Sequence, residues 1–312
     1  MADNEVYALL EAVTPSVDRL MAEHRERREH WYAHEYVPWE QGRNFVTEPW
    51  EESHASLSPE VRTALVLNLL TEDNLPYYHA EIEQHLPGGS PWQDWNRLWT
   101  AEEGQHAIAL RSYLLTSRNC DPAELEDDRF ATMERGYEGD FENPIDVFVY
   151  TSAQELATRV SHRNAGKLAD EKTAYDIMAR IAADENHHFI FYKSVVAEML
   201  AENPSPVLES MHRVLANFQM PGTGSPGYLR RAVAMAKSGV YNLRQHHDRV
   251  VVGHPDRNGD EVDVRLHGRF AHVAVCPRYP VRLGCGGGRG TGFISSRSSC
   301  SWPRRRLTSA WR

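Results

Sequence analysis

A six-residue pattern that occurs twice limits how this chain can fold. The segments "AEEGQH" at residues 101–106 and "ADENHH" at residues 183–188 both consist of alanine, an acid, glutamate, two variable residues and histidine. Residues three positions apart share one face of an α-helix, so each segment can present a carboxylate and an imidazole to one ion. Such a pair is more often a solvated ion pair, and the spacing also occurs elsewhere in the chain. The surroundings of the two segments therefore decide between these interpretations.

The surroundings of both hexapeptides favour a metal site. Apolar residues flank each segment at helical spacing, so the glutamates and histidines would face a core, where unpaired charge is costly. A further glutamate precedes each segment: Glu72 lies 31 residues before Glu103, and Glu155 lies 30 residues before Glu185. The order Glu, ExxH, Glu, ExxH on four helices is the ligand set of ferritin-like di-iron and di-manganese bundles. The candidate metal ligands are Glu72, Glu103, His106, Glu155, Glu185 and His188.

Helix-start signals divide most of the chain into helices. A capping side chain followed by proline begins the segments "SPEV" at 58, "SPWQ" at 90, "NPID" at 143 and "SPVL" at 205. A further helix is predicted from about Glu171 to Glu202, with Pro204 ending it. No segment alternates convincingly with a period of two. The sequence therefore predicts an all-α fold, with a ferritin-like antiparallel four-helix bundle as its core and additional flanking helices.

The chemistry of the candidate ligands favours iron. Four carboxylates can neutralise and bridge two divalent cations, and two neutral imidazoles complete the coordination while leaving positions open for dioxygen. Zinc prefers a tetrahedral site with fewer carboxylates. The four cysteines contain no CxxC pair, which excludes a zinc ribbon and a disulfide framework. We therefore expect two iron ions per chain, held by oxygen and nitrogen.

The composition of the chain indicates its cellular location. The first residues, "MADNEVYALLEAV", lack the basic segment and apolar core of a secretory signal. The longest apolar run, "ALVLNLL", is too short to cross a bilayer. The sequence therefore predicts a cytoplasmic protein without membrane insertion.

Residues 251–312 differ in composition from residues 1–250. They contain eleven arginines and four acidic residues, whereas the preceding part is acidic overall. A basic arm that binds nucleic acid is one interpretation. We favour the other, a shift of reading frame, which comparison of the coding DNA in three frames would test. We thus predict a ferritin-like di-iron domain at 1–250, an irregular tail at 251–312 and no nucleic-acid partner.

Four stretches of the chain resemble the acyl-acyl-carrier-protein desaturases, the plastid stearoyl type and its bacterial relatives. They are "LTEDNLPYY", "WTAEEGQH", "YTSAQELATRVSH" and "IAADENHH", which follow the family's order with closely similar spacing across roughly residues 25–245. By position, the resemblance implies that Glu103 and Glu185 bridge two irons. It also implies terminal carboxylates and nitrogen ligands at Glu72, Glu155, His106 and His188.

The resemblance also implies a reaction and partners. The acyl chain would arrive on acyl carrier protein and extend into an apolar tunnel. A ferredoxin-type donor would supply electrons, and dioxygen would be reduced while two hydrogens leave the chain and a cis double bond forms. A homodimer is also implied. The basic segments "HRERREH" at 24–30 and Arg230 with Arg231 are candidates for docking the acidic carrier protein, with solvated helix faces as the alternative.

Three further residues match the family by position. Thr158 corresponds to a threonine beside the dioxygen site, and the alternative is a helix threonine bonded to its own backbone. Asp184 would orient a ligating histidine, or could be a surface acid. Trp31 corresponds to a tryptophan near the electron path, although a lone tryptophan is more often part of the core.

The variable positions of the hexapeptides depart from the plant type. Gly104-Gln105 and Asn186-His187 replace Asn-Arg and Lys-Arg, and Gly104 weakens its helix by roughly 1 kcal/mol. None of these positions is a candidate ligand. They leave three alternatives to a desaturase: a catalytically silent paralogue that binds metal or an acyl chain, an iron-storage or ferroxidase protein, and a related di-iron oxygenase.

Overall fold

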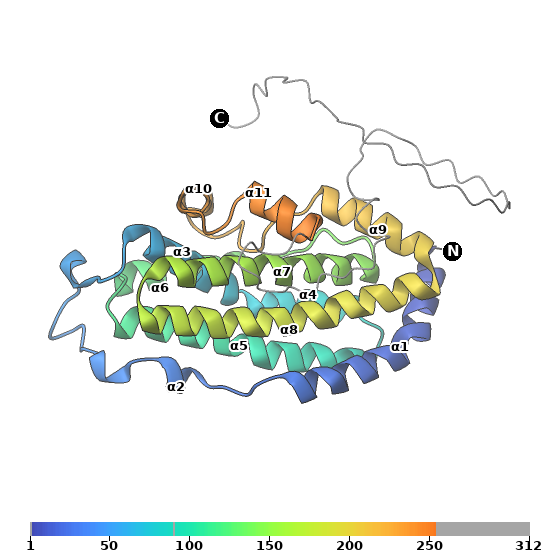
Figure 1. The fold of residues 1–312 in the computed structure, drawn as a ribbon, viewed down its shortest axis with the longest axis horizontal. Coiled ribbons are helices and arrows are strands. Elements are labelled where there is room, and N and C mark those ends of the chain that lie inside the picture. Colours follow the sequence, from blue (N-terminus) through green and yellow to red (C-terminus); the bar gives the residue numbers. More distant parts are fainter. Residues whose placement is uncertain (1, 90, 254–312) are drawn as a thin grey trace, which may run out of the picture. The chain divides into compact units, whose positions relative to one another are not determined.

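The described part of the chain, residues 2–89 and 91–253 of a computed structural model, consists of helices and loops without a strand (Figure 1). The predicted tail at 251–312 lies outside the described residues except for its first three. The main helices are α1 (Ala2–Arg27), α3 (Pro59–Glu72), α4 (Leu75–His85), α5 (Trp92–Thr116), α6 (Pro122–Arg135), α7 (Pro144–Ala169), α8 (Lys172–Glu202), α9 (Pro204–Ala216) and α10 (Tyr228–Ser238). Shorter elements are α2 (Ala33–Tyr36), η1 (Trp39–Gln41), η2 (Glu52–His54), α11 (Leu243–Gln245) and η3 (His246–Val251). The all-α prediction is confirmed.

Side-chain caps begin several of these helices as predicted. Ser58 accepts a hydrogen bond from the backbone N–H of Val61 at the start of α3. Asn143 caps the first turn of α7 in the same way, and Glu171 caps α8. Each cap pairs backbone N–H groups that the helix itself leaves without partners. Local sequence chemistry therefore determines where these three helices begin.

Two predicted helix starts are displaced. Helix α9 begins at Pro204 and not at Pro206, because the N–H groups of a first turn have no helical partner and both prolines fit there. Helix α5 begins at Trp92, so Pro91 precedes the helix. Ser90, the predicted cap, lies outside the described residues.

Four helices form the bundle around the candidate ligands. Helices α7 and α8 pack along each other, joined by only Asp170 and Glu171, which makes them an antiparallel pair. Helix α3 packs against α5 and α7, and α5 also packs against α8. The predicted bundle with flanking helices is thus confirmed. None of the helices in residues 2–89 and 91–253 combines the length and apolar character needed to cross a membrane.

Helix α1 covers the outer side of α8. Its residues Val6, Leu10, Val13 and Val17 are buried in one core cluster with Trp95 of α5. Full burial of an aliphatic side chain contributes about 1.5–3 kcal/mol, so α1 adds substantially to the stability of the bundle. Its C-terminal end brings the chain to the candidate metal site.

Two glycines allow a direct test of helix packing. A Cβ on Gly166 of α7 would lie 2.9 Å from the Cβ of Met178 on α8, whereas a Cβ on Gly104 of α5 would have no atom within 4 Å. We expect Gly166→Ala to destabilise the protein by roughly 1–3 kcal/mol, because α7 and α8 must separate. Gly104→Ala should stabilise it by roughly 0.5–1 kcal/mol, because alanine favours the helix. Urea unfolding measures both, and a stabilised Gly166→Ala variant would contradict the close packing.

Candidate metal centre

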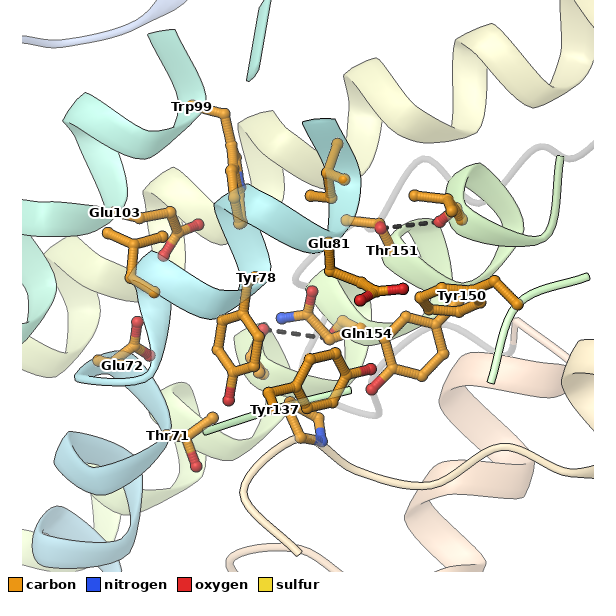
Figure 2. A pocket seen from close by; sticks show the side chains of 16 residues that line it. Thr71, Glu72, Tyr78, Glu81, Trp99, Glu103, Tyr137, Tyr150, Thr151 and Gln154 are labelled. Carbon is orange, nitrogen blue, oxygen red and sulfur yellow. Dashed lines mark hydrogen bonds between the residues drawn. The ribbon is translucent and has the colours of Figure 1, made fainter. Parts of the chain in front are cut away.

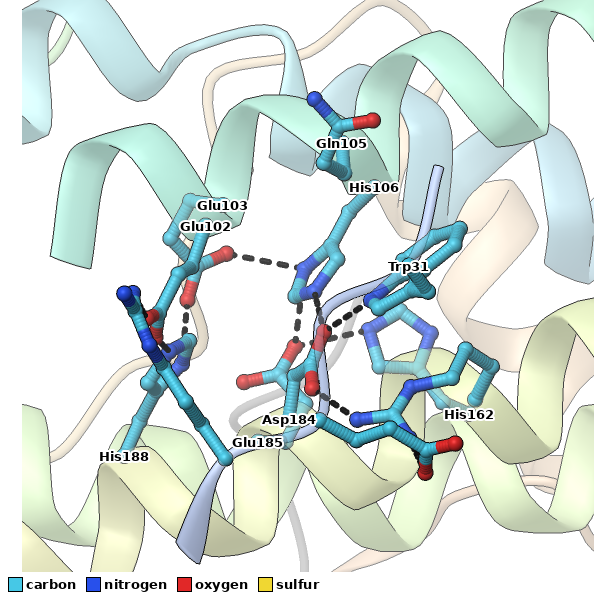
Figure 3. Close-up of polar contacts among 12 residues, drawn as sticks. Trp31, Glu102, Glu103, Gln105, His106, His162, Asp184, Glu185 and His188 are labelled. Atoms are coloured by element: carbon cyan, nitrogen blue, oxygen red, sulfur yellow. Dashed lines mark hydrogen bonds and ion pairs between the residues drawn. The ribbon is translucent and has the colours of Figure 1, made fainter. Parts of the chain in front are cut away.

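The six candidate ligands converge inside the bundle. Figure 3 shows four of them, Glu103, His106, Glu185 and His188. Their ligand atoms form two groups within 4.8 Å, one of Glu72, Glu103, His106 and Glu185 and the other of Glu103, Glu155, Glu185 and His188. Glu103 and Glu185 belong to both groups. None of the six residues is more than 7% exposed. The arrangement therefore offers two adjacent ion sites that share two carboxylates.

Both histidines turn the same nitrogen towards this cage. The Nδ1 atom of His106 lies 3.0 Å from Oε2 of Glu103 and 3.6 Å from Oε2 of Glu72. The Nδ1 atom of His188 lies 2.8 Å from Oε1 of Glu103 and 3.7 Å from Oε2 of Glu155. These contacts lack hydrogen-bond geometry, since both Nδ1 atoms are buried without a hydrogen-bond partner. Both Nδ1 atoms can therefore bind an ion once they release their protons.

Carboxylate oxygens in the cage are also left without partners. Oε1 of Glu103, Oε2 of Glu155 and Oε2 of Glu185 are buried without a hydrogen bond. Burial of unpaired polar groups is costly, and native proteins rarely tolerate several such atoms at one place. Hard oxygen donors beside two imidazole nitrogens suit divalent first-row metals. The residues present therefore fit a pair of metal ions.

The pKa shifts of two glutamates reflect this crowding. Burial, together with the charges of Glu103 and Glu155, raises the pKa of Glu185 well above its ordinary value. Burial opposes ionisation of Glu103 too, but the charges of His106 and His188 prevail and lower its pKa. Nearby like charges therefore help to raise the pKa of Glu185, whereas nearby opposite charges lower the pKa of Glu103.

Asp184 lies where the sequence predicts an orienting group. Its Oδ2 atom lies 3.4 Å from Nε2 of His106 and accepts a hydrogen bond of 2.6 Å from Nε1 of Trp31. Arg180 donates to the other oxygen. Trp31 is 6% exposed, so it belongs to the core while contacting this acid. Asp184 is therefore not a surface acid.

Glu102 makes the corresponding contacts to the second histidine, and sequence reasoning missed it. Its Oε2 atom lies 3.0 Å from Nε2 of His188 and 2.8 Å from Nε2 of His24, and Arg28 donates to Oε1. These imidazole contacts lower the pKa of Glu102 although burial opposes that shift. The sequence does contain a signal for Glu102, because this residue occupies the same position in its hexapeptide as Asp184 does in the other.

A third buried histidine beside the cage was also missed. The Nε2 atom of His162 lies 3.0 Å from Oε1 of Glu72 and 3.2 Å from Oε1 of Glu185. Its spacing of seven residues from Glu155 on α7 places both on one helix face. This spacing is the sequence feature that could have identified His162. Burial would lower the pKa of His162, but hydrogen bonds to Glu185 and Glu72 raise it to about 9.

A cavity adjoins the candidate ligands (Figure 2). It has about 570 Å³ of space between its walls, its mouth included. Glu72, Glu103 and Thr158 line it together with apolar and aromatic side chains. The Thr158 hydroxyl donates to the backbone carbonyls of Gln154 and Glu155, as the alternative interpretation of this residue predicts. Trp99, another wall residue, donates to Oε1 of Glu155 at 3.0 Å.

A helical bundle in which two buried Glu/His groups share two carboxylates beside a cavity resembles the class of carboxylate-rich metal-binding bundles. The chain belongs to the fatty acid desaturase family, whose model matches residues 4–254. It is 41% identical over 255 residues to the putative acyl-acyl-carrier-protein desaturase DesA1 of Mycobacterium tuberculosis, across 78% of this chain and 75% of that protein. The predicted family is confirmed.

Other relatives extend the similarity. Stearoyl-acyl-carrier-protein 9-desaturase 2, chloroplastic, of Arabidopsis thaliana is 35% identical over 200 residues, which cover 58% of this chain and 49% of that protein. The X-ray structure of the putative acyl-ACP desaturase DesA2 from Mycobacterium tuberculosis H37Rv matches with a TM-score of 0.66 and 27% identity. This match covers 78% of this chain and 92% of that chain.

The metal-free protein should lose stability as the pH rises. The pKa of His162 is raised from 6.5 to about 9 in the folded state, so its stabilising contribution is full below pH 6.5 and disappears as the pH approaches 9. We expect the free energy of unfolding to fall across this window, and to fall less steeply in His162→Gln. Urea unfolding of metal-free protein at several pH values measures this slope. Stability that rises with pH in this window would contradict the proton assignment.

Proposed function

We propose that this chain is an acyl-acyl-carrier-protein desaturase with two iron ions held by Glu72, Glu103, His106, Glu155, Glu185 and His188. One observation carries the proposal: two ligand groups share Glu103 and Glu185, and the cavity wall includes Glu72 and Glu103. An occupant of the cavity would therefore lie against the metal centre. Several relatives, including DesA1, are named acyl-acyl-carrier-protein desaturases.

The donor set supports iron. Four carboxylates and two imidazoles provide hard oxygen and borderline nitrogen donors with positions left for a small molecule. When bound, the iron pair supplies reversible electron transfer and activation of dioxygen, which removal of hydrogen from an unactivated chain requires. The protein orients both imidazoles through Asp184 and Glu102, and it holds Glu155 through Trp99.

The side chains of the cavity position the substrate. Trp99 and Ile82 are buried apolar residues of the cavity wall, suited to contact with methylene groups. Thr158 lines the same cavity as Glu103 and can exchange its backbone hydrogen bond for a polar reactant. Trp31, bonded to Asp184, remains the proposed entry for electrons to the His106 side.

The partners follow from the proposed reaction: acyl carrier protein brings the chain, dioxygen is the oxidant, and a ferredoxin-type protein supplies electrons. The proposed basic docking segments are partly committed to internal contacts. His24 and Arg28 contact Glu102, and Arg231 donates to Asp128. Arg25 and Arg230 are exposed and are the better candidates for binding an acidic carrier. The homodimer and the cytoplasmic location stay predictions.

Mass analysis of the acyl product tests the function. Reduced, iron-loaded protein is mixed with dioxygen and a panel of acyl carrier proteins that differ in chain length. We expect a product 2 mass units lighter, because two hydrogens leave the chain. Glu155→Gln, which removes one carboxylate charge from the centre, should abolish this product.

The alternatives give different results in the same experiment. A gain of 16 mass units would identify an oxygenase, and an unchanged chain on iron-loaded protein would identify a silent paralogue. Many irons per chain would identify a storage protein. Each of these outcomes contradicts a desaturase.

The cavity wall contains, besides the candidate ligands, a further buried carboxylate that should restrict the substrate. Glu81 of α4 is 8% exposed, lines the cavity and bonds to Nε2 of His85 at 3.2 Å. A methylene group next to this carboxylate desolvates it without replacing its hydrogen bonds. We expect Glu81→Leu to raise kcat/KM for chains long enough to reach this wall, by roughly fourfold per contacting methylene, since each contributes about 0.8 kcal/mol.

Two controls isolate the effect at Glu81. Glu81→Gln keeps the shape and polarity of the side chain, so it should leave chain-length preference near that of the wild type. Chains too short to reach Glu81 should react equally with all three proteins. Equal gains for short and long chains in Glu81→Leu would show that Glu81 does not contact the substrate.

A further inference from the structure

The acids that contact the two candidate histidine ligands, Asp184 and Glu102, have matching surroundings. Figure 3 shows both acids with His106, His188 and Trp31. One oxygen of Asp184 faces Nε2 of His106 and the ring N–H of Trp31, and Arg180 donates to the other oxygen. One oxygen of Glu102 faces Nε2 of His188 and Nε2 of His24, and Arg28 donates to the other. Each acid thus has the same three kinds of neighbour: a candidate ligand, a ring from the N-terminal segment and an arginine.

The acids also cross between the two hexapeptides. Asp184 belongs to the segment on α8 and contacts His106 on α5, whereas Glu102 belongs to the segment on α5 and contacts His188 on α8. The two helices are therefore tied at both candidate histidines. The rings that complete these contacts come from outside the four-helix bundle, His24 from the last turn of α1 and Trp31 from the following loop.

His24 is held tightly in its position. Its side chain is 3% exposed, and its ring packs edge-on against Trp95 with centroids 5.0 Å apart. It also stacks on His188 with centroids 5.8 Å apart. A buried imidazole without a hydrogen bond would be costly, and the carboxylate of Glu102 is its partner. Arg28 lies four residues later and reaches the same carboxylate, so one stretch of chain holds both oxygens of Glu102.

We propose that His24 is a positioning residue for His188, acting through Glu102. By holding the Glu102 carboxylate, His24 keeps it where it accepts the Nε2–H of His188, which leaves the Nδ1 lone pair directed into the cage. Trp31 does the same for His106 through Asp184. The inference rests on the proposed metal centre, and it assigns one N-terminal ring to each of the two metal sites.

Iron binding by matched variants tests the role of His24. His24→Phe keeps an aromatic ring but removes the hydrogen bond, whereas His24→Gln keeps an N–H donor for Glu102. Anaerobic titration with Fe²⁺ alone should resolve two binding steps in the wild type. We expect His24→Phe to weaken one step by roughly 10- to 100-fold, the usual effect of losing a group that orients a ligand, and to leave the other step unchanged. His24→Gln should restore affinity to within a few fold of the wild type.

Mössbauer spectra of the same samples show which iron is affected. His24→Phe should change the signal of one iron, and Trp31→Phe should change that of the other, because their acids contact different histidines. Circular dichroism and thermal unfolding of each metal-free variant verify that it folds.

Several results would overturn this role. These are unchanged Fe²⁺ affinity in His24→Phe, equal losses in His24→Phe and His24→Gln, or changes to the same iron signal in His24→Phe and Trp31→Phe. A wild-type protein that binds no pair of Fe²⁺ ions would overturn the metal centre and the role of His24 together. A wild-type protein that binds two Fe²⁺ ions without desaturating any chain would overturn only the proposed reaction.

Discussion

Four glutamates buried beside each other are the constraint on which the rest of this structure depends. Glu72, Glu103, Glu155 and Glu185 lie in a helical core, where an uncompensated carboxylate costs several kcal/mol. Only cations can neutralise so much charge at one place, and three imidazoles lie within reach of these carboxylates. In the metal-free protein, protons bound to the imidazoles neutralise part of the carboxylate charge. Two metal ions would neutralise the rest, so folding, protonation and metal binding depend on one set of residues.

The segments outside the four-helix bundle matter because their side chains contact the acids beside the two candidate ligand histidines. Helix α1 packs on α8 through aliphatic side chains, and the chain that leaves it supplies His24, Arg28 and Trp31 to the acids behind the histidines. The α7–α8 hairpin, with its two-residue connection, aligns Glu155 with Glu185 and His188. The geometry of the candidate site thus depends on packing by elements outside the four-helix bundle. The cavity between α4, α5 and α7 opens against the same carboxylates.

Sequence reasoning predicted the parts of this structure that local rules govern. The caps at Ser58 and Asn143, the α8 helix and the ExxH spacing follow from chemistry within a few residues. The six candidate ligands lie together, while their role as metal ligands stays a prediction. Helix α1 was not predicted, because it begins without a capping proline and contains Pro15. His24 could not be singled out, because its partner Glu102 lies 78 residues away in the sequence. His162 shares a helix face with Glu155, but that spacing does not reveal its partner Glu72, which lies 90 residues away.

Anomalous X-ray diffraction at the iron absorption edge, on crystals of protein reconstituted with Fe²⁺, tests the central claim most directly. We predict two anomalous peaks inside the bundle about 3.5–4 Å apart, with Glu103 and Glu185 in contact with both and His106 and His188 each beside one. A single peak, or peaks bound only by surface residues, would contradict the claim that these four helices enclose a two-metal centre.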